Sequence, residues 1–256
     1  MKRIWIAFVL LIATAVFSSC QKEFAFSDSP SNLPSASPSG STLDKVKTYT
    51  EDLTASGEHT VMTYDLAYDE KGRVTSMTSV STAGDKFVYD YSTDNSFSLD
   101  IYNSSKVSIH VVYFLNSLSL VDSSFQYNDN KDTSTEKYLY NARQLDKLEQ
   151  FEYVTDAGQV LADVHSYSYD LYGNMLQDST SNSVKSYEYY DNLVDNLSMG
   201  VSFFRKNKNL VKRTTYTEGG SSETSDHTYT FDSLNRITSE KEVLSTGDVV
   251  IRRYTY

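Results

Sequence analysis

The sequence predicts an all-β protein, a large antiparallel meander of about 14–16 strands curled into a barrel-like roll. The first observation is composition, because 21 of the 256 residues are tyrosine and Thr and Val are also abundant. Aromatic and β-branched residues favour strands. The second is a turn signal that recurs roughly every 8 to 15 residues. The third is the spacing of aromatic residues in pairs two positions apart, which places both rings on one face of a strand. A sheet of more than about ten strands curls or closes.

Residues 1–19 are expected to form a lipoprotein signal peptide. Lys2 and Arg3 precede an apolar run over residues 4–17 that is too short for a comfortable membrane span. Phe17-Ser18-Ser19-Cys20 resembles a bacterial lipobox, although most lipoboxes carry Leu or Val where this chain has Phe17. Cys20 is the single cysteine, so we expect lipidation there and no internal disulfide. The alternative is an ordinary signal peptide with a cysteine near its end.

Residues 20–42 are expected to be the lipidated N-terminus and a flexible tether, since residues 27–42 hold all three prolines among many serines. No second linker interrupts residues 43–256, which predicts a single β domain with YD-like repeats. The expected location is the outer membrane, with the domain extracytoplasmic and anchored through its lipid. Whether it faces the periplasm or the cell surface stays open, because Gln21-Lys22-Glu23 only partly matches an acidic export signal.

The charge of the chain excludes some partners. The formal net charge is −11, and without Lys2 and Arg3 the 21 remaining basic residues stand against 34 acidic ones. Nucleic-acid binding needs clustered cations, so no nucleic-acid partner is expected.

One short phrase marks the turns. It places Asp at the first turn position and Gly or Asn at the fourth, as Asp69 with Gly72, Asp170 with Gly173, and Asp232 with Asn235. The aspartate can accept backbone amides and fix a type I turn. The fourth residue must then adopt a left-handed conformation, which glycine and asparagine tolerate best. These six residues are predicted to be structural turn residues.

The strands are expected to carry the aromatic pairs. Cross-strand aromatic contacts stabilise a sheet, which is the favoured explanation, while exposed rings offer faces for sugars or proteins, and no ligand-contacting aromatics are assigned. Residues 107–115 are the most apolar strand and the expected centre of the core. The pairs are Phe87/Tyr89, Phe125/Tyr127, Tyr138/Tyr140, Phe151/Tyr153, Tyr167/Tyr169, Tyr187/Tyr189, Tyr229/Phe231 and Tyr254/Tyr256.

Residues 190–200 break the alternation. Leu193, Val194 and Leu197 have a spacing nearer to a helical turn than to a strand. A short helix near residues 192–199 and an irregular loop are the two alternatives.

The phrase at residues 68–76, Tyr-Asp-Glu-Lys-Gly-Arg-Val-Thr-Ser, resembles the YD repeat of Rhs-type cell-surface proteins. A closer resemblance is to lipoproteins of the Bacteroidota that carry a domain of unknown function with a porin-like fold. There the middle segment combines an Asn-Leu-x-x-Asn-Leu element, here residues 192–197, with a Lys-Asn-Leu element, here residues 208–210. The resemblance implies a large curled antiparallel sheet and brings no activity, cofactor or catalytic residue.

No motif for chemistry stands out. His59, His110, His165 and His227 are far apart in sequence, so no metal site is predicted, and no cofactor or catalytic residue is assigned. Residues 128–132 superficially resemble a calcium loop, but Leu139 stands where a glutamate would be required.

The preferred function is a non-catalytic envelope-anchored module that binds a glycan, a lipid-like ligand or a protein. The alternative is a hydrolase of envelope or extracellular polysaccharide that uses a carboxylate pair. A membrane-spanning barrel is not expected, because residues 73–80 and 237–243 have one face that is Ser/Thr-rich or charged.

Overall fold

The computed structural model describes residues 45–128, 133–141, 144–154, 158–197, 199 and 207–256. The predicted signal peptide, Cys20 and the tether therefore lie outside the described residues, as do residues 129–132 of the calcium-like loop. In the described part there are sixteen strands and no helix, which confirms the all-β prediction and the upper end of the predicted strand number. No helix long and apolar enough to cross a membrane occurs there.

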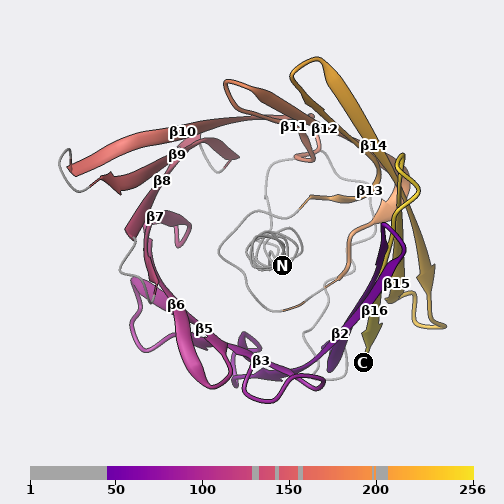
Figure 1. Cartoon of the computed structure of the whole chain (residues 1–256), viewed down its shortest axis with the longest axis horizontal. Coiled ribbons are helices and arrows are strands. Elements are labelled where there is room, and N and C mark those ends of the chain that lie inside the picture. Colours follow the sequence, from indigo (N-terminus) through magenta and orange to yellow (C-terminus); the bar gives the residue numbers. More distant parts are fainter. Residues whose placement is uncertain (1–44, 129–132, 142–143, 155–157, 198, 200–206) are drawn as a thin grey trace, which may run out of the picture.

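The strands follow one another around a closed antiparallel barrel, in which each pairs with the next and β1 pairs with β16. Figure 1 looks down the barrel and shows this ring, with the earliest and latest strands side by side. The strands are β1 (Thr48–Ala55), β2 (Glu58–Tyr68), β3 (Val74–Ser79), β4 (Lys86–Asp90), β5 (Ser96–Asn103), β6 (Lys106–Leu115), β7 (Val121–Asn128), β8 (Thr133–Asn141), β9 (Gln144–Val154), β10 (Gly158–Tyr169), β11 (Met175–Ser179), β12 (Ser183–Val194), β13 (Asn209–Glu218), β14 (Ser221–Phe231), β15 (Ile237–Leu244) and β16 (Val249–Thr255).

Closure follows from the register of the first and last strands. Tyr49 of β1 pairs with Tyr254 of β16 on one side and with Tyr64 of β2 on the other. Their rings lie 5.7 Å and 6.5 Å apart inside the barrel. Because side chains alternate along a strand, Thr48 and Thr50 face outward. The barrel therefore closes around an aromatic seam.

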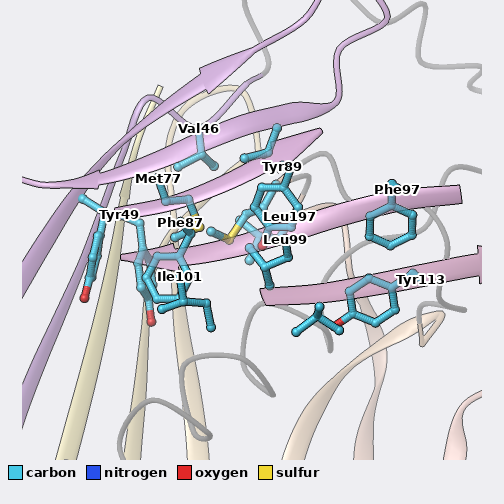
Figure 2. Close-up of a cluster of buried hydrophobic side chains, with 14 of the residues drawn as sticks. Val46, Tyr49, Met77, Phe87, Tyr89, Phe97, Leu99, Ile101, Tyr113 and Leu197 are labelled. Atoms are coloured by element: carbon cyan, nitrogen blue, oxygen red, sulfur yellow. The ribbon is translucent and has the colours of Figure 1, made fainter. Parts of the chain in front are cut away.

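The apolar core lies in the lumen, where the early strands contribute Met77 and Leu99 and the later strands β13 and β15 contribute Leu210 and Ile237. Leu197, which follows β12, belongs to the same cluster, as Figure 2 shows. A residue from the second half of the chain thus packs against the wall that the early strands form.

The expected core strand at residues 107–115 is only half buried. In β6, Val111 and Tyr113 are buried, but Phe114 is exposed on the outer wall. An apolar run therefore does not mean burial on both faces here, because a barrel wall has one face toward the lumen and one on the outside.

The middle segment forms no helix at residues 192–197 or at 199. Its first part continues β12, in which Val194 still pairs with Asn209 of β13. Beyond it, the Asp195 amide donates to the Lys208 carbonyl (3.0 Å) and Leu197 enters the core. The apolar spacing arises because Leu197 enters the core. Of the two predicted alternatives, the irregular loop describes residues 195–197.

Candidate functional site

The predicted turn residues lie at one end of the barrel, which we call the Asp-turn end. In the first turn, the Gly72 amide donates to the Asp69 carbonyl (2.9 Å), and Asp69 Oδ1 accepts the Arg73 amide (2.8 Å). The φ angle at the fourth position is 77° for Gly72, 91° for Gly173 and 60° for Asn235. These are left-handed values, so the three phrases encode one backbone shape.

Each turn is also tied to its surroundings. Arg73 bonds to Asp69 Oδ2 (2.7 Å) and lies over the Tyr91 ring (4.1 Å), and Arg236 lies in the same way over Tyr256 (4.3 Å). These contacts are structural, since they fix loops against the rim of the barrel.

In the Asp170 turn, Asn174 stands four residues after the aspartate, where the other two turns have Arg73 and Arg236. Its Oδ1 accepts the Asn209 amide (2.8 Å), so this turn is joined to the Lys-Asn-Leu element at residues 208–210. Both elements of the middle segment thus have structural roles, because the other one supplies Leu197.

Part of the lumen next to the apolar core is polar and contains Arg252. Its guanidinium contacts Glu242 (3.0 Å), Glu51 (3.3 Å) and Glu240 (3.5 Å), and all four side chains are at least four-fifths buried. Burial alone would raise the pKa of the Glu240 carboxyl, but the hydrogen bond from His227 and the charge of Arg252 lower it. Glu240 is therefore an ionised partner and is poorly suited to donate a proton as a glycosidase acid does.

The same region contains an arrangement with the order of a Ser-His-acid triad. Ser225 Oγ lies 3.3 Å from His227 Nε2, and His227 Nδ1 lies 2.9 Å from Glu240 Oε1. Ser225 and His227 are buried, and Ser225 Oγ also bonds to Thr214. The strand that carries both residues, β14, pairs with β13 and β15, so its backbone amides are engaged in the ladder and are not available to an oxyanion.

The four histidines do not come together. Each pairs instead with a nearby carboxylate, and the partners are Asp52 for His59, Asp100 for His110, Asp178 for His165 and Glu240 for His227. Within the described ranges, no group of three or more His, Cys, Asp or Glu side chains is placed to hold a metal ion.

A cavity opens in the lumen at the end opposite the Asp turns. Its volume is about 370 Å³, and it lies between β10, β11, β12 and β13. His165 Nδ1 bonds to Asp178 Oδ1 (2.8 Å) in its wall, and Tyr216 donates its hydroxyl hydrogen to Glu218 (2.9 Å). The hydrogen bond that His165 donates to Asp178 raises the pKa of His165.

The outer wall is polar over β1 to β5, where the outward positions include Thr50, Asp65, Thr78, Lys86 and Asp100. An apolar patch interrupts this pattern farther around. We call it the β6–β10 patch and define it by the side chains of Val112, Phe114, Phe125, Tyr127, Phe151, Tyr153 and Leu161.

The β6–β10 patch follows one row of paired residues. Phe125 pairs with Val112 on β6 and with Thr135 on β8. The row then continues from Thr135 to Phe151 on β9 and to Leu161 on β10. The row faces outward because Val112 lies between Val111 and Tyr113, whose side chains are buried in the lumen, and Phe125 and Leu161 are 39% and 51% exposed.

Sequence reasoning found neither the cavity nor the patch. Phe125/Tyr127 and Phe151/Tyr153 were visible as aromatic pairs, but their outward direction was not. The other six pairs face the lumen, and burial raises the pKa of Tyr167 and Tyr187 among them.

Two solved structures have a similar fold. The chain matches a porin-like protein from Bacteroides uniformis ATCC 8492 with a TM-score of 0.62 and 15% identity, over 83% of this chain and 97% of that one. It matches a porin-like protein from Bacteroides vulgatus ATCC 8482 with a TM-score of 0.60 and 15% identity, over 83% and 98%. No family model and no curated protein sequence matches the chain. The likeness shows a porin-like barrel fold.

Proposed function

We propose that the protein is a non-catalytic binding module of the cell envelope, held at the outer membrane by a lipid on Cys20. The β6–β10 patch is the observation that carries this proposal. Aromatic rings and a leucine gather on this part of the outer wall, whereas over β1 to β5 the outward positions include threonines, aspartates and a lysine. Exposed contiguous apolar surface on a folded domain is typical of an interaction site.

The composition of the patch supports contact with a glycan or a protein. Tyr127 and Tyr153 combine a flat apolar face with a hydroxyl, which suits both sugar rings and protein partners. The charged residues Lys137 and Glu149 pair in the adjacent outward row and give the patch a polar rim. An apolar centre with a polar rim is the usual anatomy of a specific interface.

The polar outer wall supports the lipid anchor as the means of attachment. A membrane-spanning barrel needs an outward apolar band about 25 Å tall around its whole circumference. Asp65, Asp100 and Lys86 would then lie in such a band among threonines and serines. A barrel tethered by its N-terminus has no such requirement.

The test compares the wild-type protein with Phe125→Ser/Tyr153→Ser, using a glycan array and capture of partners from envelope extracts. We expect the double variant to keep its unfolding temperature and to lose the ligand. Tyr172→Ser is the matched control, because Tyr172 is 70% exposed in the Asp170 turn, away from the patch. A ligand that binds the patch double variant as well as it binds the Tyr172→Ser control would overturn the role of the patch.

Hydrolysis is the second candidate function, and the Ser225, His227 and Glu240 arrangement is the observation in its favour. A fluorophosphonate probe tests it, because such probes label activated serines. Labelling that Ser225→Ala abolishes would support a hydrolase. An unlabelled protein would leave the three residues as part of the polar network around Arg252.

A further inference from the structure

The cavity between β10 and β13 lies apart from the β6–β10 patch, on the lumen side of the wall. It is bounded by inward side chains from four consecutive strands, and Asp178, Lys185 and Tyr216 stand in one row of paired residues. Ligand pockets usually span about 300–1,000 Å³, so its volume of about 370 Å³ suits a small ligand.

The charges around the cavity favour a cation. Asp163, Asp178 and Glu218 supply three carboxylates, against the single ammonium group of Lys185. The other titratable groups in the lining are His165 and Tyr216. His165 bonds to Asp178 and so engages one of the three carboxylates. Asp163 accepts the Val164 amide through one carboxylate oxygen (2.8 Å), and Glu218 accepts the Tyr216 hydroxyl.

The rest of the wall can recognise hydroxyl groups. Thr180, Asn182 and Ser183 line the mouth, and Thr180 Oγ1 lies 3.0 Å from Ser183 Oγ. Such side chains both donate and accept hydrogen bonds, as do the hydroxyls of a sugar.

Tyr216 adds a flat surface. Its hydroxyl is fixed by Glu218, and the side chain is 39% exposed. An aromatic face of this kind can stack against the apolar face of a pyranose ring and attract an ammonium group.

We propose that this cavity binds an amino sugar with a free ammonium group. The ammonium would lie against the carboxylate side chains that line the cavity, the ring against Tyr216, and the hydroxyls toward the Thr180 to Ser183 mouth. This site goes beyond the proposed binding function of the outer patch and stands without it, because the two sites share no residue.

The test titrates the mature full-length protein with D-glucosamine, D-glucose and N-acetyl-D-glucosamine, by calorimetry at a pH at which the amine is protonated. Charge-assisted hydrogen bonds distinguish the first sugar from the two neutral ones, so we expect it to bind about tenfold more tightly. Equal affinity for the three sugars would overturn the proposal, as would the absence of saturable binding.

Variants locate the binding. Asp163→Asn keeps the size of the side chain and should weaken D-glucosamine binding by about fivefold or more. Glu188→Gln makes the same charge change on the outer face of β12 and should leave binding unchanged. If Asp163→Asn fails to fold, Glu218→Gln gives the same measurement. D-Glucosamine binding that neither cavity variant weakens would place the sugar elsewhere and refute the site.

Discussion

At the scale of single residues, tyrosine is used for its hydroxyl as well as its ring. Carbonyls at the ends of strands lack a ladder partner, and a buried carbonyl needs a donor. Tyrosine hydroxyls supply it at the Asp-turn end, where phenylalanine could not. The pairs are Tyr68 with Val46 (2.6 Å), Tyr140 with Val121 (2.7 Å), Tyr189 with Met175 (2.6 Å) and Tyr256 with Ile237 (3.0 Å).

Asn235 tests the conformational role of the fourth turn position. Its φ of 60° is left-handed, so Asn235→Gly should leave the free energy of unfolding unchanged or raise it slightly. Asn235→Val should lower it by about 1–2 kcal/mol, because a β-branched side chain disfavours that conformation. Denaturant unfolding of the three proteins measures the difference. Equal stability of the glycine and valine variants would contradict the role assigned to the backbone.

The turn aspartates should make the barrel sensitive to acid. Burial opposes ionisation of Asp170, but hydrogen bonds from Asn174 and the neighbouring amides lower its pKa below 3.8, and the amide and guanidinium of Arg236 lower that of Asp232. A carboxyl whose folded pKa is lowered stabilises the fold above its unfolded pKa. That stabilisation is lost as the pH falls through the folded value.

The melting temperature should therefore drop as the pH falls from about 4 to about 2, and Asp170→Asn should flatten this dependence. Asp65→Asn, which removes a carboxylate from the outer face of β2, serves as the control. A wild-type melting temperature that does not change over this range would show that the turn carboxylates contribute little.

At the scale of the strands, sequence alternation predicts where the strands lie better than it predicts which of their faces points into the lumen. A pair such as Phe125/Tyr127 looks the same as Tyr138/Tyr140 in sequence, yet the first faces outward and the second faces the lumen. The direction depends on bulges, such as the one between Leu161 and Asp163, which shift the register locally. No turn signal marks that bulge, so the patch could not be predicted.

The network around Arg252 links β1, β15 and β16. Arg252→Met would leave Glu51, Glu240 and Glu242 without their shared cation in a buried place. Removing one partner of a buried ion pair typically costs about 3–5 kcal/mol, and we expect a loss of that size in the free energy of unfolding. Arg252→Met/Glu51→Gln should recover part of the loss, because one uncompensated charge disappears.

Arg213→Met is the matched control for this network. Arg213 also bonds to a carboxylate, Asp226 (2.6 Å), but both side chains are exposed on the outer wall. Solvent screens such a pair, so the substitution should change stability little. If both arginine variants lose the same stability, burial does not decide the strength of these contacts.

At the scale of the whole molecule, closure and the lumen cavity depend on distant residues. Thr48 pairs with Thr255, and the cavity joins side chains from Asp163 to Glu218. Local patterns carry no information about which strands meet when a sheet curls. The sequence therefore predicts a curled sheet of the right size, whereas the closed ring and its internal cavity follow only from the assembled register.

The polarity of the wall leads to a final prediction about the whole barrel. Outward threonines, aspartates and lysines over β1 to β5 form favourable contacts with water, and the aromatic seam of Tyr49, Tyr64 and Tyr254 is enclosed in the lumen. The mature chain with Cys20→Ser should therefore stay folded and in solution without detergent. Sedimentation and circular dichroism in aqueous buffer check this, with a cooperative loss of β signal expected on heating. A barrel whose wall contacts lipid would expose an apolar band and aggregate under these conditions, so aggregation that only detergent reverses would refute the tethered arrangement.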